Sequence, residues 1–290
     1  MHSDAQRWRD AAQHFSFEGQ QIAYWAGGSG RPLLLVHGFP TCSWDWAAMW
    51  EALAQDHSLI ACDMLGFGLS DKPPDEYRLM RQASLQQALL DHLGIDEFDA
   101  LVHDYGVSVG QELLARQQEG SGAEGLGQMV FLNGGIFPSK HHPRPIQRVG
   151  ASPLGFVVSM LMNRQRFGKS FAEVFGPDTQ PSAEELDIFW DFISHNNGHR
   201  RTHKLLRYMA ERRDNALRWG GALVPAQERI GLINGALDPV SGEHLYDEWR
   251  IRVPLARHHL LPNVGHYPQV EAPGEVSAKV LEWLATQPVA

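Results

Sequence analysis

Continuous apolar runs alternate with helical periodicity along the first half of the chain. The run PLLLVHG is apolar up to its last residues, which is typical of a strand buried on both faces of a sheet. Other segments instead repeat their large apolar side chains at helical spacing. We expect strands at 22–28, 32–38, 57–66, 99–106 and 126–135, and helices at 44–56, 79–95 and 107–118. This alternation predicts a parallel sheet with helices on both faces.

The second half departs from this rhythm. Between residues 136 and 223 the sequence contains only helical patterns separated by Pro and Gly. The sheet pattern then returns, with strands expected at 227–235 and 256–264 and helices at 241–250 and 274–287. We therefore predict an α/β protein with a mostly parallel central sheet, helices on both faces and an inserted helical lid. The predicted core comprises residues 1–135 and 224–290, and the predicted lid residues 136–223.

The composition fits one large globular unit. The chain has 290 residues, of which 43% are hydrophobic and 20% charged, so we expect a substantial core and no extensive disorder. Its formal net charge of −9 argues against a nucleic-acid-binding protein, which needs clustered Lys and Arg. The basic clusters at 164–169 and 199–204 are interrupted by apolar residues, and we interpret them as solvated helix faces.

Neither the cysteines nor the apolar segments indicate secretion or a membrane. Cys42 and Cys62 are too few for a disulfide framework or a thiolate metal site, which fits a reducing cytosol. Residues 1–15 are polar and lack the apolar stretch of a signal peptide. The longest apolar stretch, 153–162, is too short to span a bilayer. We therefore predict a cytoplasmic protein, monomeric or homodimeric, with no membrane partner.

The stretch LVHDYGVSVG contains the first candidate for chemistry. A strand pattern ends here and a helical pattern begins, which is where hydrolases usually present a serine on a sharp turn. The central residue is instead Asp104, followed two positions later by Gly106, a small residue of the kind that such a turn needs. Asp104 also suits the N-cap of the following helix, so this motif alone leaves catalysis and capping both open.

Two further candidates follow the last two predicted strands. Asp238 comes after the first of these strands, and His266 after the second, on a loop constrained by Gly265 and Pro268. Each residue taken singly also suits a structural role, such as a turn aspartate before proline. Together with Asp104 they reproduce the chain order nucleophile, acid, histidine of α/β-hydrolases. We therefore predict that Asp104, Asp238 and His266 form a catalytic triad.

The turn HGFP after another predicted strand supplies the next element. Its Phe39 N–H is expected to approach Asp104, and the Tyr105 N–H is the natural second donor. Two such N–H groups form an oxyanion hole. We expect His37 and His103 to hold loops in place by hydrogen bonding rather than to transfer protons.

These motifs resemble those of a known superfamily. HGFP, DMLGFGLSDKP, HDYG, GALDP and GHYPQVEAP are similar to the α/β-hydrolase branch that contains epoxide hydrolases and haloalkane dehalogenases. Within it, VHDYG, QELLAR, LNGGIFP, EVFGPDTQPS, ALDPV and HYPQVE most closely resemble the mesoderm-specific transcript proteins. The resemblance runs from about residue 17 to the C-terminus, lid included. It implies an α/β-hydrolase fold and a reaction that needs no metal and no organic cofactor.

The resemblance also implies a covalent route through an aspartate. A carboxylate that attacks an sp³ carbon becomes an alkyl ester, which water can then cleave at its carbonyl. In this chain Asp104 would form the ester, and His266, held by Asp238, would activate the water. The N–H groups of Phe39 and Tyr105 would stabilise the resulting oxyanion.

The leaving group separates the reactions of this branch. An epoxide oxygen needs an acid, usually a lid tyrosine, and Tyr208 is the single tyrosine of the predicted lid. A halide needs N–H donors, but Tyr105 and Phe39 stand where dehalogenases have Trp and Asn. We therefore expect hydrolysis of an epoxide to a vicinal diol, with Tyr208 as the acid, although a surface position of its hydroxyl stays open. The alternatives are a haloalkane dehalogenase, then an esterase-type hydrolase or a non-catalytic hydrolase-fold binding protein.

Aromatic residues supply the predicted substrate pocket. Trp44, Phe137 and Trp190 are expected to line it, although each taken singly also suits a packed core. Trp190, in the predicted lid, would partly replace the missing halide donors. The implied substrate is small to medium in size, apolar and uncharged, and it reacts with water.

Overall fold

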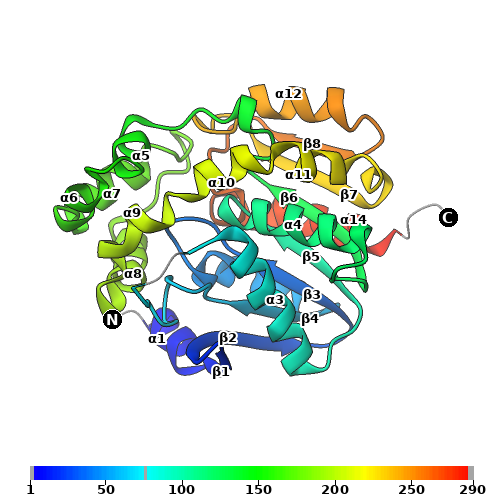
Figure 1. Ribbon diagram of the computed structural model, residues 1–290, viewed down its shortest axis with the longest axis horizontal. Helices are drawn as coiled ribbons and strands as arrows, with labels where there is room; N and C mark the ends of the chain where they lie inside the picture. Colours follow the sequence, from blue (N-terminus) through cyan, green and yellow to red (C-terminus); the bar gives the residue numbers. More distant parts are fainter. Residues whose placement is uncertain (1–2, 75–76, 287–290) are drawn as a thin grey trace.

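One eight-stranded sheet forms the centre of the protein in the computed structural model, which describes residues 3–74 and 77–286 (Figure 1). The strands are β1 (Gln13–Phe17), β2 (Gln20–Gly28), β3 (Arg31–Val36), β4 (His57–Cys62), β5 (Phe98–Val102), β6 (Leu126–Leu132), β7 (Ile230–Gly235) and β8 (Arg257–Leu261). Their spatial order is β1-β2-β4-β3-β5-β6-β7-β8. β1 and β4 pair antiparallel with β2, and all other pairs are parallel. The predicted α/β class with a mostly parallel sheet is confirmed.

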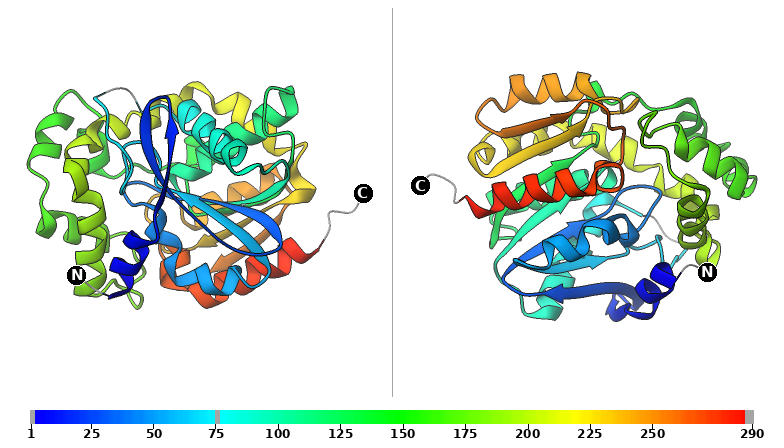
Figure 2. Two further views of the ribbon diagram at one scale, coloured as in Figure 1. Left: turned by 90° about the horizontal axis from the view of Figure 1, so that it is seen from below. Right: turned by 180° about the vertical axis from the view of Figure 1, so that it is seen from behind.

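Helices cover both faces of the sheet because the central strands are apolar on both sides. Within β3, Leu33 and Leu35 pack with α2 and α14, whereas Leu34 and Val36 pack with α3 and α4. This division follows from the two-residue repeat of a strand. The helices of the core are α2 (Ala47–Leu53), α3 (Leu79–Leu93), α4 (Tyr105–Glu119), α12 (Glu243–Arg252), α13 (Pro268–Glu271) and α14 (Pro273–Ala285). Figure 2 shows α14 in front of the sheet from behind, opposite to α3 and α4 in Figure 1.

The first strand, β1, is missing from the sequence-based prediction. It forms a hairpin with β2 through Glu18 and Gly19, whose φ angles are 49° and 77°. Only Phe15 and Phe17 of β1 are buried, so the apolar pattern is too short to stand out. Two short helices also precede α2 in the chain: α1 (Ser3–Asp10) and the 3-10 helix η1 (Ser43–Trp46).

Five strands, β3, β4, β5, β6 and β8, end earlier than their apolar patterns predict. β4 ends at Cys62, and β5 ends at Val102, each four residues earlier than expected. The helix α4 begins at Tyr105, two residues early. Residues beyond each strand, such as Met64 and His103, are fully buried although they lie outside the regular strand. Burial therefore continues past the point where the backbone turns, and the sequence pattern follows burial.

The chain between β6 and β7 is helical and contains no strand in the residues that the structure describes. Its elements are η2 (Pro138–Lys140), α5 (Pro145–Gly150), α6 (Gly155–Met160), α7 (Arg164–Ala172), α8 (Ala183–Ser194), η3 (His195–Arg201), α9 (Thr202–Leu205), α10 (Tyr208–Asp214), α11 (Ala216–Leu223) and η4 (Gln227–Arg229). α11 contacts the core helix α4, where the Trp219 indole donates to Glu112 at 2.7 Å. The division into core and lid stays a prediction. Across both described ranges, no helix is long and apolar enough to cross a membrane.

Candidate active site

Asp104 lies on a sharp turn between β5 and α4, residues 103–106, here called the elbow. Its φ of 43° and ψ of −102° are rare for a residue with a side chain, so surrounding contacts must hold it. Its N–H donates to the Asn133 carbonyl at 2.8 Å, and the Gly106 N–H donates to the His37 carbonyl at 3.1 Å. A Cβ at Gly106 would lie 2.3 Å from the Val36 carbonyl oxygen. Glycine therefore allows α4 to begin directly against the end of β3.

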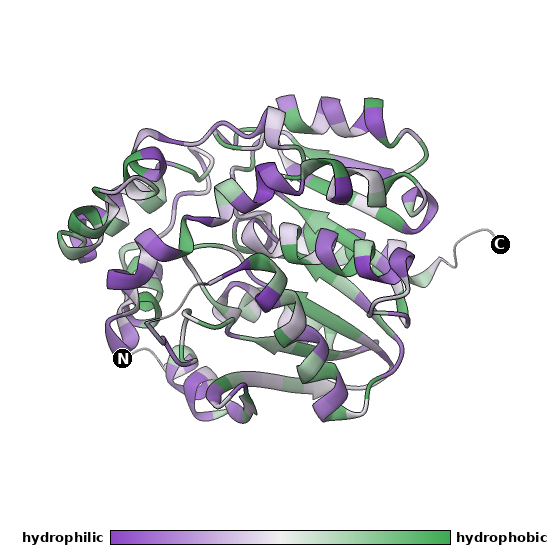
Figure 3. Cartoon of the chain, viewed as in Figure 1, coloured by the Kyte–Doolittle hydropathy of each residue, from purple (hydrophilic) through white to green (hydrophobic). Residues whose placement is uncertain are grey.

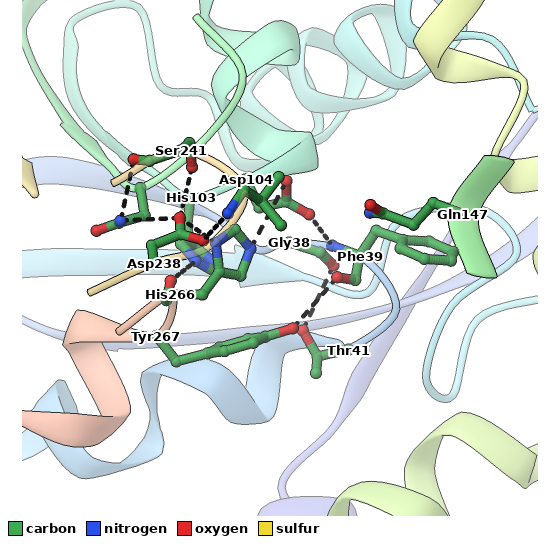
Figure 4. A network of polar contacts seen from close by, with 12 residues as sticks. Gly38, Phe39, Thr41, His103, Asp104, Gln147, Asp238, Ser241, His266 and Tyr267 are labelled. Carbon is green, nitrogen blue, oxygen red and sulfur yellow. Dashed lines mark hydrogen bonds and ion pairs between the residues drawn. The ribbon is translucent and has the colours of Figure 1, made fainter. Parts of the chain in front are cut away.

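The side chain of Asp104 does not cap α4. In the described structure, no cap hydrogen bond joins its carboxylate to the first turn of that helix. Oδ2 instead accepts the Phe39 N–H at 3.0 Å, from the turn that follows β3 (Figure 4). The capping interpretation of this motif is therefore wrong.

The structure brings Asp104, Asp238 and His266 together from three strand ends. Asp238 follows β7 and His266 follows β8, and Oδ2 of the first lies 2.7 Å from Nδ1 of the second. The other ring nitrogen of His266, Nε2, lies 3.8 Å from Asp104 Oδ1. The exposed fractions of Asp104, Asp238 and His266 are 4%, 3% and 5%. One imidazole is thus oriented by one carboxylate and directed at another, as a catalytic base requires.

The groups around Asp238 keep it ionised. Burial by itself raises the pKa of this carboxyl, but the charge of His266 and several hydrogen bonds outweigh burial and hold the pKa well below its usual range. Besides His266, the donors are Ser241 Oγ at 2.6 Å, the Val240 N–H at 2.7 Å and Asn133 Nδ2 at 3.0 Å. An ionised Asp238 fixes the orientation and tautomer of the His266 ring.

The ionisation of His266 depends on both carboxylates. Burial lowers the pKa of the imidazole, but the charge and hydrogen bond of Asp238, together with the charge of Asp104, raise it to about 9. At neutral pH the ring is therefore an imidazolium, placed between the side chains of Asp238 and Asp104. It must lose a proton before it can act as a base, and any loss of negative charge at Asp104 lowers its pKa.

Two other histidines hold the loops of the site. Nε2 of His103 donates to the His266 carbonyl at 2.8 Å, and burial lowers the pKa of His103 to about 3, so this ring is neutral. Nε2 of His37 accepts the Met64 N–H at 3.0 Å. A Cβ at Gly38 would lie 2.7 Å from His103 Nδ1, so the turn after β3 requires glycine at this point. Both rings lie behind the site and support the residues in front of them.

The predicted oxyanion donors lie on either side of Asp104. The Phe39 N–H binds Asp104 Oδ2, and Tyr105 is the first residue of α4, so the role of its N–H as second donor stays a prediction. The side chain of Tyr105 is fully buried in the core, with its ring 5.4 Å from that of Phe67. Its hydroxyl donates to the Tyr77 carbonyl at 3.4 Å. Only the backbone of Tyr105 is therefore available to the site.

A cavity of about 360 Å³ is lined by Asp104 and His266. Most of its wall is apolar and comes from the turn after β3, the loop after β8 and helices α5, α6, α7 and α9. Polar side chains also reach it: Arg144, Gln147, Ser159, Arg166, Ser170 and Thr202. In Figure 4 the Gln147 side chain extends toward Phe39. A cavity of this size suits a small to medium organic molecule.

The predicted pocket residues Trp44, Phe137 and Trp190 do not line this cavity. Trp44 stacks on Phe192 at 5.9 Å between ring centroids, beside helix α1. Phe137 lies 4.9 Å from the Arg252 guanidinium, and Trp190 contacts other aromatic rings of the helical segment. This prediction was wrong because helical spacing identifies an apolar face but not what that face packs against.

Tyr208 is buried beside the elbow rather than on the cavity wall. Its ring lies 5.3 Å from that of Tyr105 and 6.2 Å from that of Phe39, and burial raises the pKa of its hydroxyl. The hydroxyl makes no hydrogen bond of regular geometry with any described residue, although the Arg212 guanidinium lies 4.6 Å from the ring centroid. The alternative of a surface hydroxyl is therefore wrong.

Two residues near the site have no role in the sequence-based prediction. Tyr267 lines the cavity, and its hydroxyl donates to the Phe39 carbonyl at 3.2 Å. Arg212 is 2% exposed and donates to Ser108 Oγ at 2.8 Å and to the Asp104 carbonyl at 3.3 Å. The position of Tyr267 next to the predicted base was a usable signal. Nothing in the charged run ERRD distinguishes the buried arginine from its exposed neighbour.

Among the described residues, no group of His, Cys, Asp and Glu side chains is arranged to hold a metal ion.

Sequence comparison agrees with this fold. Residues 33–279 match the alpha/beta hydrolase family, and the chain belongs to that family. The mesoderm-specific transcript homolog protein of Homo sapiens is 39% identical over 279 residues, covering 92% of this chain and 83% of the relative. The putative hydrolase LipZ of Mycobacterium tuberculosis is 36% identical over 279 residues, covering 96% of both chains. The predicted resemblance is thereby confirmed.

Other similar proteins are named for particular reactions. The cis-3-alkyl-4-alkyloxetan-2-one decarboxylase of Shewanella oneidensis is 29% identical over 301 residues, covering 95% of this chain and 91% of the relative. The solved structure of the epoxide hydrolase CorEH has a TM-score of 0.75 at 21% identity, covering 94% of this chain and 98% of that chain. The solved structure of the haloalkane dehalogenase DbeA from Bradyrhizobium elkani has a TM-score of 0.77 at 24% identity, covering 94% of this chain and 97% of that chain. At these identities the solved structures show the fold alone.

Proposed function

We propose that Asp104 forms a covalent alkyl ester that water then cleaves, and that the substrate is an epoxide converted to a vicinal diol. One observation carries the proposal: the two oxygens of the Asp104 carboxylate face different partners. Oδ2 accepts the Phe39 N–H at 3.0 Å, whereas Oδ1 lies 3.8 Å from His266 Nε2, and all three residues line the cavity. One oxygen is thus held in place while the other is available for attack.

In the first step, Asp104 Oδ1 attacks an epoxide carbon in line with the C–O bond that breaks. The new bond makes an ester of Asp104, and the ring oxygen leaves with the electron pair and takes up a proton. An aspartate suits this reaction because water can hydrolyse the resulting ester. The ether that a serine would form with the same carbon could not be hydrolysed in this way.

In the second step, His266 removes a proton from a water molecule whose oxygen attacks Asp104 Cγ. Formation of the ester has removed the negative charge of Asp104, so the pKa of His266 falls and the ring becomes a better source of neutral base. The charge that develops on Oδ2 is stabilised by the N–H groups of Phe39 and Tyr105. The bond between Cγ and Oδ1 then breaks, and Oδ1 takes up the proton that His266 removed from water. The diol leaves with Oδ1, and the oxygen of water stays on Cγ and completes the carboxylate.

Tyr208 is the proposed proton donor to the epoxide oxygen. It lies next to the elbow, and its hydroxyl makes no regular hydrogen bond with a described residue. Its ring contacts that of Phe39, which lines the cavity. Because Tyr208 is not on the cavity wall, side chains of that wall must rearrange before its hydroxyl can reach a substrate.

A haloalkane dehalogenase is the weaker alternative. Release of a halide needs N–H donors directed into the cavity, and the side chains at positions 39 and 105 are Phe and Tyr. Tyr105 is buried in the core, and Trp190 does not reach the cavity. Of the described residues in the cavity wall, none is a tryptophan.

A strained four-membered lactone is the second candidate substrate. The Shewanella oneidensis decarboxylase, named for an oxetan-2-one, is similar over nearly the whole of this chain. When a nucleophile opens such a ring at its sp³ carbon, the leaving group is a carboxylate, which needs no strong acid. The observation that favours this candidate is the position of Tyr208, whose hydroxyl is not on the cavity wall.

A single turnover in H₂¹⁸O tests the covalent route. With the enzyme in excess over a terminal alkyl epoxide, we expect label in the Asp104 carboxylate and an unlabelled diol. The reason is that the diol receives Oδ1, while the oxygen of water becomes attached to Cγ. Mass spectrometry of the diol and of the peptide that contains Asp104 measures both. Label in the diol and none in Asp104 would overturn the proposal.

The variant His266→Gln separates the two steps. It should form the ester but not hydrolyse it, so the peptide with Asp104 gains the mass of the substrate. His259→Gln is the matched control and should turn over normally, because this partly exposed ring on β8 pairs with Glu275. Parallel assays with an epoxide, a haloalkane, an oxetan-2-one and a carboxylic ester identify the leaving group.

A further inference from the structure

Helix α6 packs with its small residues inward and its large apolar residues outward. Gly155 and Ser159 are buried, whereas Phe156, Val157 and Met160 have exposed fractions of 58%, 50% and 44%. A surface helix of a globular protein normally has the opposite arrangement. α6 lies at the outer edge of the molecule, at the left of Figure 1, and Figure 3 shows hydrophobic colouring there.

The contacts of the buried face hold α6 in this orientation. A Cβ at Gly155 would lie 1.8 Å from the Gly150 carbonyl oxygen, so no larger residue fits there. Ser159 Oγ lies 2.9 Å from Thr202 Oγ1 and accepts the His203 N–H at 3.0 Å. The inward face is therefore specified by close packing and hydrogen bonds. On the apolar face, the edge contact between the rings of Phe156 and His203, 5.8 Å between centroids, leaves the large side chains mostly exposed.

The exposed face of α6 is part of a larger apolar surface, here called the apolar ridge. It consists of Ile146, Val149, Leu154, Phe156, Val157, Met160 and Leu161, each 44% to 65% exposed. These are seven of the thirteen exposed large hydrophobic residues in the described part of the chain, and all seven lie within the sixteen positions from 146 to 161. Single exposed apolar residues are normal on a protein surface, but a cluster of this kind marks an interaction site.

Positive charge surrounds the apolar ridge although the whole chain is acidic. Residues 125–172 contain no Asp or Glu, whereas the chain has 34 of them and a net charge of −9. The same segment contains six basic residues: Lys140, Arg144, Arg148, Arg164, Arg166 and Lys169. Lys140, Arg144 and Arg164 form ion pairs with carboxylates. In the described structure, no ion pair with a carboxylate is formed by the other three, Arg148, Arg166 and Lys169. The second basic cluster, 199–204, lies against α6 through Thr202 and His203.

The apolar ridge is continuous with the cavity. Ile146 and Leu161 are exposed to solvent on one side and line the cavity on the other, and the basic Arg166 lines it as well. Val158, between the exposed residues of α6, also belongs to the cavity wall. An apolar molecule at the ridge would therefore be next to the space that leads to Asp104.

We propose that the apolar ridge docks on the surface of an anionic lipid membrane. The apolar side chains enter the boundary between headgroups and acyl chains, and the surrounding Arg and Lys side chains bind lipid phosphates. If the proposed function holds, apolar substrate then passes from the bilayer into the cavity. A second copy of the chain fits less well, because a symmetric contact would bring the basic residues of both copies together. The sequence pattern predicted no membrane partner, since the outward orientation of α6 depends on tertiary contacts.

Vesicle binding tests this proposal without reference to catalysis. The full chain should sediment with phosphatidylcholine vesicles that contain phosphatidylglycerol, and much less with pure phosphatidylcholine. Added salt should weaken the binding, because surface charges are screened. Leu154→Asp with Phe156→Asp should reduce the affinity about tenfold or more, since both apolar contact and charge attraction are lost. Arg148→Glu with Lys169→Glu should act in the same direction.

The matched control is Leu217→Asp with Ile251→Asp. These two residues are 93% and 74% exposed and lie on α11 and α12, outside the ridge, so vesicle binding should be unchanged. Hydrolysis of a water-soluble substrate should be the same in all these variants, which separates docking from the proposed reaction. Absence of binding by the unaltered protein, or equal loss in the control, would overturn the proposal. Analytical ultracentrifugation tests for a dimer instead. A dimer that dissociates in the ridge variants but persists when vesicles are added would also overturn the proposal.

Discussion

Asp104 combines a strained backbone with a buried charge. A non-glycine residue at a φ of 43° costs about 1–3 kcal/mol, and such strain persists only where surrounding contacts determine the backbone. Here Asn133, His37 and Phe39 bind the elbow from three directions. Asp104 is thus held at the cavity wall before a substrate arrives, so the proposed reaction would need little reorganisation of this residue.

Replacement of a single hydroxyl tests the proposed acid. Tyr208→Phe should slow the opening of an epoxide about tenfold or more, because general acids typically contribute 10²–10⁴-fold. The opening of an oxetan-2-one should change little, since a carboxylate leaves without protonation. Presteady-state rates of ester formation measure both.

Tyr246→Phe is the control for this experiment. Its hydroxyl is hydrogen-bonded to His258 Nδ1 at 2.6 Å, in the pair of α12 and β8, and its removal should leave epoxide opening unaltered. An unchanged epoxide rate in Tyr208→Phe would remove Tyr208 from the mechanism and favour the lactone.

The element that matters most for the site is the junction of β5 and α4. The helix begins so close to the end of β3 that the Gly106 N–H donates to the carbonyl of His37, in the turn that follows β3. The same proximity excludes a side chain, because backbone carbonyls occupy the space that a Cβ would need. The position of Asp104 therefore depends on glycine at a neighbouring residue, as well as on the aspartate.

Gly106→Ala should destabilise the protein by at least about 1–3 kcal/mol, the usual cost of overpacking. A Cβ there would lie 2.3 Å and 2.8 Å from two backbone carbonyl oxygens, which cannot yield as a flexible side chain can. Urea unfolding measures the loss. Gly220→Ala in α11 is the control: nothing lies within 4 Å of its Cβ, so stability should rise by about 0.5–1 kcal/mol. Equal stability of both variants would contradict this account of the elbow.

At the scale of the whole molecule, the sheet brings together charges that are far apart in the sequence. Asp104, Asp238 and His266 follow β5, β7 and β8, and each is placed by a separate strand end. The pKa of His266 is consequently a property of the assembled fold, because Asp238 and Asp104 together raise it against the effect of burial.

Ester hydrolysis should accelerate with rising pH and then level off, because only neutral His266 acts as the base. The pKa of His266 in the free enzyme is raised to about 9 partly by Asp104, and ester formation removes that charge. The plateau should therefore begin below about pH 9. Ester formation uses the Asp104 carboxylate and the proton of the Tyr208 hydroxyl, whose pKa burial raises, and does not use neutral His266, so it should not follow this profile. Rapid-quench single turnovers across the neutral and alkaline range measure both steps.

Asp238→Asn provides the comparison for this pH profile. It removes the largest contribution that raises the pKa of His266, so the rise in ester hydrolysis should move to lower pH. His259→Gln should not move it. A common profile for both steps, or no shift in Asp238→Asn, would show that His266 does not set the pH dependence.

The sequence alone was sufficient for the fold class and for the residues that meet around Asp104. The buried strands are continuous apolar runs, and parallel strands place their carboxyl ends at one edge of the sheet, so residue types after those runs can be combined without coordinates. Asp104, Asp238, His266 and the turn at Phe39 are all of this kind. Their predicted roles follow from chemistry and still await the experiments above.

Only the tertiary structure decided which helix faces point at the cavity, at the core or at the exterior. Helical periodicity groups side chains on one face, but the partner of that face is set by contacts with distant segments. For this reason Trp44, Phe137 and Trp190 do not line the cavity. Tyr208 is buried against the rings of Phe39 and Tyr105, and Tyr267 lines the wall. For the same reason the apolar side of α6 faces outward: Gly155 and Ser159 fit against their neighbours, and larger side chains do not.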